Sequence, residues 1–338
     1  MSFFKVIDKG AENTILAFSS ISTPIGRFRF EKQLEKINVN AIYINCPKNS
    51  WYQHEIPGLG DNHENVTIKL QDIIKLNFSG TKLFAIGSSM GASGLITLAS
   101  TLNIENAFAF CPEIFLFEHR SFSEKYYSHE CPPVRKDIFN ELLAFKNISL
   151  FYGEECENDL GQVSRISQSA KKISKKINIT TFANEGHGVI EAIYLTEGID
   201  MVIHSLVNNL PLRPNVIKFG DLGVNHFAAK ILWRAWLSNN TNKDKVLVDL
   251  FIWKKRTDAS LSYYPLILYW ISKLTKNSEY IEEAFLISPY SKKIAVEYFS
   301  DCLSTRDERT EYINSFKKKY GELYISNARA KPIVELGL

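Results

Sequence analysis

The chain has 338 residues, of which 45% are hydrophobic and 23% charged, as is usual for a globular protein with one large domain and a smaller one. Its net charge of +3 is too small to indicate a nucleic-acid partner. The opening MSFFKVIDKG lacks the apolar core of a secretory signal, and no stretch approaches the roughly 20 apolar residues of a membrane span. We therefore expect a cytoplasmic protein without a membrane span.

Short runs rich in β-branched and aromatic residues recur through the first 183 positions, with helical patterns between them. Most are apolar on both faces, as is typical of strands buried in a parallel sheet. The alternation predicts a doubly wound α/β domain. The predicted strands are 14–20, 41–46, 82–87, 106–111, 148–153 and 178–183, and the clearest predicted helices are 64–77, 91–102 and 163–176.

Two later segments depart from this rhythm. Residues 112–147 are rich in aromatic residues and histidine and lie between two predicted strands, so they are either a cap over a site or a plain excursion with one helix. After residue 210 strand signals vanish, and 211–220 has the composition of a linker. The sequence thus predicts a catalytic domain over 1–210 and a small all-helical C-terminal domain over 211–338.

The segment IGSSMGASG (86–94) directly follows the apolar strand KLFAIG. Gly87 to Gly91 fit the G-x-S-x-G pattern, in which a serine sits on a tight strand-to-helix turn and its small neighbours allow close packing. Ser89 is therefore the predicted nucleophile. The backbone N–H of Met90 is the predicted oxyanion donor, with a second donor from Ser19 or Ser20 in the loop after the first strand.

A serine nucleophile needs a base and an acid that orients it. His187, in NEGHGVIEAI, follows the last predicted strand and has glycines on both sides, so it is the predicted base. The acid is expected in GEECENDL after the preceding strand. We favour Asp159, at the opening of the next helix, and keep Glu155 and Glu157 as alternatives.

Five segments, FSS…STPIGRF, NSWYQHEIPGLG, FAIGSSMGASG, FYGEECENDL and EGHG, resemble the α/β-hydrolase superfamily in this order. Within it they resemble divergent members from bacterial surface-polysaccharide loci, which include O-acetyltransferases of capsule sugars. The resemblance covers about residues 14 to 205 and departs at Cys156, where a common pattern has the acid. It implies an α/β-hydrolase-like, mostly parallel sheet flanked by helices, with Ser89 as nucleophile, His187 as base, and neither a metal nor an organic cofactor.

These residues predict acyl-ester chemistry through an acyl-serine, ending in either ester hydrolysis or O-acetyl transfer. Expected partners are a small-molecule ester or acyl-CoA, with acetyl-CoA as co-substrate for transfer, and a glycan acceptor such as a bacterial surface polysaccharide. Trp51 and Tyr52 are candidates for stacking on a sugar. The alternative is an inactive α/β-hydrolase-fold scaffold that binds a protein or glycan through its helical tail.

Overall fold

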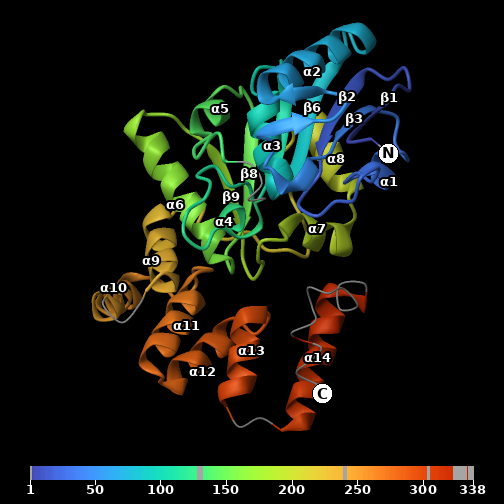
Figure 1. Cartoon of the computed structure of the whole chain (residues 1–338). Coiled ribbons are helices and arrows are strands. Elements are labelled where there is room, and N and C mark those ends of the chain that lie inside the picture. Colours follow the sequence, from blue (N-terminus) through green and yellow to red (C-terminus); the bar gives the residue numbers. More distant parts are fainter. Residues whose placement is uncertain (1, 128–131, 239–241, 303–304, 323–332, 334–338) are drawn as a thin grey trace. The chain divides into compact units, whose positions relative to one another are not determined.

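The computed structural model of the chain describes residues 2–127, 132–238, 242–302, 305–322 and 333 (Figure 1). Among these residues, seven strands form one sheet in the order β1-β3-β2-β6-β7-β8-β9. All pairs with a described register are parallel except β1 with β3. The strands are β1 (Phe4–Ile7), β2 (Asn13–Phe18), β3 (Asn40–Ile44), β6 (Lys82–Ser88), β7 (Ile104–Phe110), β8 (Ile148–Gly153) and β9 (Asn178–Phe182), and a separate hairpin pairs β4 (His54–Ile56) with β5 (Gly60–Asn62).

The predicted mostly parallel sheet is confirmed, and each of the six predicted strands is present with ends shifted by a few residues. Most of these strands are buried on both faces, which explains their near-continuous apolar sequences. The sequence analysis missed β1, β4 and β5. These strands are three or four residues long and only partly buried, so they carry little alternating pattern.

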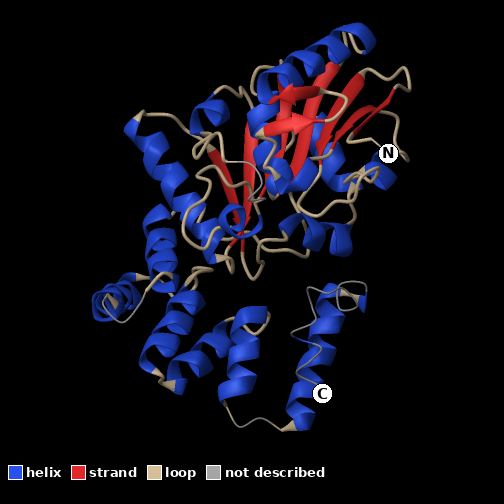
Figure 2. Cartoon of the chain, viewed as in Figure 1, coloured by secondary structure: helices blue, strands red, loops and turns tan. Residues whose placement is uncertain are grey.

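Helices account for most of the remaining regular structure. Figure 2 shows helices beside the sheet and along the described part of the C-terminal region, as the sequence predicted. They are α1 (Glu31–Leu34), α2 (His63–Asn77), α3 (Met90–Ala99), α4 (Phe122–Tyr126), α5 (Phe139–Leu143), α6 (Glu157–Lys172), α7 (Val189–Glu197), α8 (Asp200–Val207), α9 (His226–Trp236), α10 (Lys243–Arg256), α11 (Tyr264–Thr275), α12 (Ser278–Ile287), α13 (Lys292–Asp301) and α14 (Arg306–Tyr320), with a 3-10 turn at Pro47–Asn49. No helix in the described ranges is long and apolar enough to cross a membrane.

The chain divides into two compact units that are not the two predicted domains. Unit 1 is Met1–Phe151, Lys176–Asn178 and Ile199–Leu212, and unit 2 is Tyr152–Lys175, Ile179–Gly198 and Arg213–Leu338. Strands β8 and β9 therefore begin in unit 1 and end in unit 2. Whether 1–210 folds as a domain of its own stays a prediction, because a division by packing does not test independent folding.

In unit 1 the chain order of the strands reverses beside β2. Strand β3 lies on one side of β2 and β6 on the other, and all three run parallel. Helix α3 packs against β2, β6 and β7, while α8 packs against β7 from behind the sheet as drawn in Figure 1. In open α/β sheets, the carboxyl ends of strands at such a reversal form the usual ligand crevice. Here those ends carry Ser19 and Ser20 after β2 and Ser89 after β6.

In unit 2 the helical C-terminal region packs on α6. A Cβ atom added at Gly161 of α6 would lie 2.8 Å from the indole Nε1 of Trp233, so the ring of α9 fits only against a glycine. Further along the chain, the rings of Phe285 and Tyr298 stack with their centroids 4.2 Å apart, and Tyr312 of α14 packs against Phe285. The predicted helical C-terminal region is thus confirmed, and Trp233 packs between helices, as large aromatic side chains usually do.

Candidate functional site

Ser89 occupies a strained turn between β6 and α3. Its backbone has φ 55° and ψ −125°, a combination that is rare for residues other than glycine and costs on the order of 1–3 kcal/mol. Ser89 is only partly buried, whereas its neighbours Ser88 and Met90 are buried. Of the three residues, Ser89 is therefore the one that the turn exposes at the tip of the strand. This is the geometry that the G-x-S-x-G pattern predicts.

The two glycines of the pattern are needed because backbone segments meet there. A Cβ atom at Gly87 would lie 2.5 Å from the carbonyl oxygen of Gly91, one turn ahead. A Cβ atom at Gly91 would lie 2.5 Å from the carbonyl oxygen of Phe18 at the end of β2. Any larger side chain at these positions would push α3 away from the sheet and move Ser89. The glycines therefore fix the turn by allowing the backbone segments to approach closely.

The predicted oxyanion donors have different outcomes. Met90 is the first residue of α3, where a backbone N–H has no acceptor within the helix. The N–H of Ser19 instead donates to the carbonyl of Ile44 at 2.9 Å and continues the pairing of β2 with β3, so the prediction for Ser19 is wrong. Ser20 follows it in the chain and is partly exposed, and its role stays a prediction.

Asp159 and His187 lie together in unit 2. Nδ1 of His187 is 2.8 Å from Oδ1 of Asp159. The Asp159 side chain is 1% exposed and that of His187 is 22% exposed. A carboxylate that accepts from Nδ1–H leaves Nε2 as the proton acceptor of the neutral imidazole, which is the tautomer required of a general base. Ser89 belongs to unit 1, and its role with this pair stays a prediction.

Direct backbone contact between two loops brings this pair together. A Cβ atom at Gly153 would lie 2.1 Å from the carbonyl oxygen of Gly186, so the end of β8 touches the loop that carries His187. The N–H of Glu155 donates to the carbonyl of Glu185 at 2.9 Å, which joins the same two loops. Asp159 stands in the first turn of α6, where the helix dipole favours a carboxylate. The carboxylate that meets His187 therefore comes from the first turn of α6 rather than from the turn that directly follows β8.

The two alternative acids pair with lysines of the C-terminal region. Glu157 forms an ion pair with Lys293 of α13. Glu155 is buried and lies beside Lys292 and Lys293, and its Oε2 accepts a hydrogen bond from the backbone N–H of Lys293 at 3.4 Å. Burial raises the pKa of Glu155, and Lys292 partly offsets this effect. These contacts account for Glu155 and Glu157 without a catalytic role.

Two further glutamates of the same loops are held by the C-terminal region. Glu185 is 3% exposed and accepts from Nζ of Lys292 at 3.1 Å. Glu154 is almost fully buried and accepts from Thr181, from the N–H of Leu222 and from the hydroxyl of Ser262, at 2.7–2.8 Å. Burial raises the pKa of Glu154, while these donors lower it. Sequence reasoning missed Lys292, because nothing in SKK marks it as the partner of a residue 107 positions away.

The predicted stacking role of Trp51 and Tyr52 is wrong. Their exposed fractions are 1% and 0%, so neither ring has a face open to a ligand. The hydroxyl of Tyr52 lies 2.8 Å from the carbonyl oxygen of Ser19. A Cβ atom at Gly94 of α3 would lie 2.2 Å from the Tyr52 ring. Tyr52 therefore fills the space between α3 and the end of β2, where its hydroxyl is satisfied by backbone.

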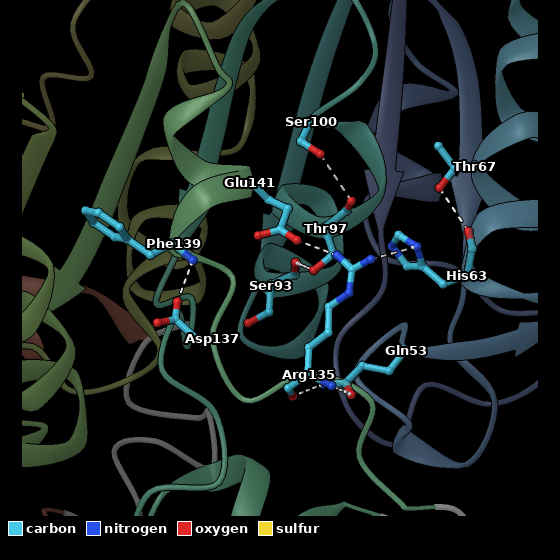
Figure 3. Close-up of polar contacts among 10 residues, drawn as sticks. All are labelled: Gln53, His63, Thr67, Ser93, Thr97, Ser100, Arg135, Asp137, Phe139 and Glu141. Carbon is cyan, nitrogen blue, oxygen red and sulfur yellow. Dashed lines mark hydrogen bonds and ion pairs between the residues drawn. The ribbon is translucent and has the colours of Figure 1, made fainter. Parts of the chain in front are cut away.

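The predicted insertion 112–147 has two short helices in its described part, α4 and α5, and residues 128–131 lie outside the described residues. Figure 3 shows Arg135 at the centre of its polar contacts. The guanidinium forms an ion pair with Glu141 and lies 3.4 Å from Nδ1 of His63, and Gln53 hydrogen-bonds the backbone of Arg135 in both directions. The insertion is thus fastened to unit 1, and its role as a cap stays a prediction.

Lys292→Met should lower the free energy of unfolding by about 3–5 kcal/mol, because it removes the ammonium group that compensates the buried carboxylate of Glu185. Lys5→Met, which breaks the more exposed pair with Glu31, should cost less than about 1 kcal/mol. Urea denaturation of the full chain measures both values. Adding Glu185→Leu to Lys292→Met should recover most of the loss, and a double variant no more stable than Lys292→Met would contradict the assignment.

The variant His63→Gln should lose less stability than the parent chain as the pH falls below about 6.5. Burial, and secondarily Arg135, lowers the pKa of His63 to about 4, whereas in an unfolded chain histidine titrates near 6.5. As the pH falls from about 6.5 towards 4, the unfolded chain takes up a proton that the folded chain does not, so stability falls through this window. Urea denaturation at several pH values should show a smaller decrease for His63→Gln, whereas exposed His204→Gln should follow the parent chain. Parallel curves for His63→Gln and the parent would contradict the prediction.

Comparisons with known proteins reach only the fold. No family model matches the chain, and no curated protein matches its sequence. Among solved structures it is similar to the capsule O-acetyltransferase of Neisseria meningitidis serogroup A, with 17% identity, a TM-score of 0.43, and coverage of 56% of this chain and 86% of that one. It is also similar to an acylaminoacyl peptidase of Pyrococcus horikoshii, with 12% identity, a TM-score of 0.40 and coverage of 55% and 35%. An esterase of Pyrococcus furiosus shares 16% identity, a TM-score of 0.38 and coverage of 52% and 74%. All three TM-scores are below 0.5, so these similarities assign the chain neither a family nor an activity.

Proposed function

We propose that the protein carries out acyl-ester chemistry with Ser89 as nucleophile, His187 as general base and Asp159 as the acid that orients the imidazole. The strained backbone of Ser89 carries the proposal, because it holds a partly exposed serine at φ 55° between a buried strand and a helix, as the G-x-S-x-G pattern requires of a nucleophile. The hydrogen-bonded pair of His187 and Asp159 supports it from the other unit. Both halves of the proposed machinery follow the carboxyl ends of strands.

In the proposed reaction, Nε2 of His187 takes the proton of Ser89 as Oγ attacks the carbonyl carbon of the ester or thioester. Asp159 stabilises the imidazolium that forms, and the N–H of Met90 donates to the developing oxyanion, with Ser20 as the proposed second donor. His187 then returns the proton to the leaving oxygen or sulfur, which leaves an acyl-serine. Attack by water or by an acceptor hydroxyl releases the acyl group and restores Ser89.

The substrates form the less defined part of the proposal. Hydrolysis needs only a small-molecule ester, whereas O-acetyl transfer needs a donor such as acetyl-CoA and an acceptor hydroxyl such as that of a bacterial surface polysaccharide. The transfer reaction would take place in the cytoplasm, where acetyl-CoA is made. Incubation with acetyl-CoA and candidate glycans separates the two, because transfer gives an acetylated sugar and hydrolysis gives acetate.

The competing proposal is an inactive scaffold that binds a protein or glycan through the helical tail. Its main support in the sequence was the irregular acid turn, in which Cys156 stands where an acid is expected. That support is weaker now, because Asp159 meets His187 from the first turn of α6 while Glu155 and Glu157 lie beside lysines of the tail. An enzyme therefore explains these residues better than a scaffold does.

Ser89→Ala should abolish labelling by a fluorophosphonate and lower the turnover of p-nitrophenyl acetate by at least about 10⁴-fold, because the nucleophile is lost. Ser88→Ala is the matched control, since Ser88 is buried beside it in the same turn, and should keep activity. Labelling is measured by mass spectrometry and turnover by absorbance. A folded wild-type chain that takes up no label, or a Ser89→Ala variant that turns over normally, would refute the proposal.

Asp159→Asn should lower turnover by on the order of 10³- to 10⁴-fold, because an amide no longer holds His187 in the required tautomer. Glu157→Gln should have a small effect, since it changes only the pair with Lys293. The two variants are compared by steady-state kinetics after thermal unfolding has shown that both fold. If Glu157→Gln or Glu155→Gln reduces turnover and Asp159→Asn does not, the acid is not Asp159.

A further inference from the structure

Unit 2 contains a cavity of about 240 Å³ that the proposed reaction does not use. Four segments of the chain line it: the loop after β9, residues 218–221, the stretch before α11, and the turn between α12 and α13, with Lys319 of α14 completing the wall. The cavity is thus built largely from the helical C-terminal region, which the sequence resemblance does not cover. Its lining mixes polar groups with aromatic rings.

Two lysines from distant parts of the chain line this cavity. Lys218 lies in the segment that precedes α9, and Lys319 lies in the last turn of α14. Within the described part of the chain, neither ammonium group has a carboxylate oxygen within 4.0 Å. The Lys319 ammonium instead lies 3.7 Å from the ring centroid of Tyr290, which also lines the cavity. Two like charges thus line one cavity, and neither forms an ion pair with a described residue.

The carboxylate of Asp221, which also lines the cavity, is hydrogen-bonded to Ser262 of the same lining. Its Oδ2 accepts from the backbone N–H of Ser262 at 2.8 Å, and its own N–H donates to the hydroxyl of Ser262 at the same distance. This reciprocal pair keeps the carboxylate with the backbone of the loop before α11. Among the described residues that line the cavity, the side chains therefore carry two positive charges and one negative charge.

The electrostatics of Lys319 agree with an anion-binding role for this cavity. Partial burial, and secondarily the charge of Lys218, lowers the pKa of Lys319 to about 8, with Glu185 acting in the opposite direction. The lowered pKa means that the surroundings destabilise the protonated ammonium group of Lys319. A bound anion would stabilise it. That Lys218 lowers the pKa of Lys319 also means that the two charges repel each other across the cavity.

We propose that this cavity is a binding site for a small phosphomonoester, whose phosphate lies between the ammonium groups of Lys218 and Lys319. Two ammonium groups match a dianionic phosphate better than a single carboxylate, and lysine binds phosphate as a point charge. Phe219, which lines the cavity and is 49% exposed, offers an apolar surface to the organic part of the ligand. The volume suits a phosphorylated sugar and is below the range typical of larger ligands.

Isothermal titration of the full chain with glucose 1-phosphate, at low ionic strength, tests the site. The parent chain should bind it, and Lys319→Met and Lys218→Met should each weaken binding by about tenfold or more, because each removes one charge. Lys318→Met changes the adjacent exposed lysine of the same helix and should bind like the parent chain. Inorganic phosphate is the second probe. Tighter binding of the ester places its organic part in the cavity, and equal affinity assigns the site to the phosphate group alone.

A second readout does not depend on variants. In the parent chain, glucose 1-phosphate should protect Lys319 from acetylation by acetic anhydride at least about threefold more than it protects Lys318, as measured by peptide mass spectrometry.

Lys319→Arg should keep most of the affinity that Lys319→Met loses, which separates loss of charge from loss of fold. The proposal is overturned if neither probe binds the parent chain, or if Lys319→Met and Lys218→Met bind as tightly as the parent.

Discussion

The structure of unit 2 depends on cations and hydrogen-bond donors that compensate several buried carboxylates. The loops after β8 and β9 and the first turn of α6 carry four carboxylates that are almost completely buried, those of Glu154, Glu155, Asp159 and Glu185. A buried carboxylate is costly unless a cation or several hydrogen-bond donors compensate it. Here Lys292 and the donors around Glu154 come from the C-terminal region, and His187 serves Asp159. The C-terminal helices are therefore part of the electrostatic environment of these loops.

This dependence gives the helical region a physical role next to the proposed catalytic pair. Lys292 binds the loop that carries His187, and Lys293 binds the first turn of the helix that carries Asp159. Two neighbouring side chains at the start of α13 thus bind the loop that carries His187 and the helix that carries Asp159. In unit 1 a different device fixes Ser89, namely the contact of glycines with backbone oxygens. The proposed nucleophile is positioned by close packing and the proposed base by charge.

The sequence predicted those features whose cause is local. A buried parallel strand is a run of apolar residues, and the turn at Ser89 needs small residues at fixed offsets, so both can be recognised in one stretch of chain. Asp159 was also predicted, because a loop that follows β8 and opens a helix has few carboxylates to choose from. The fold needed little more than these local patterns and their order.

The failures have causes that no single stretch of sequence contains. Trp51 looks like a sugar-stacking residue until the surrounding chain buries it, and the N–H of Ser19 looks available until Ile44 of the neighbouring strand accepts from it. Lys292 reads as part of an ordinary charged helix end, and its partner Glu185 stands far away in the chain. The cavity with Lys218 and Lys319 likewise joins positions about a hundred residues apart. Tertiary contacts decide all four.

The contacts of Glu154 also bear on how such a chain could have evolved. Its carboxylate bonds Leu222 and Ser262, and a Cβ atom at Gly220 would lie 2.1 Å from its Oε1. A chain without the segment beyond residue 210 would keep the bond from Thr181 to Glu154 but would lose the donors of Leu222 and Ser262. Replacement of this segment by an unrelated one would therefore remove two hydrogen-bond partners of Glu154, unless residue 154 changed as well. We expect the two parts of the chain to have diverged together.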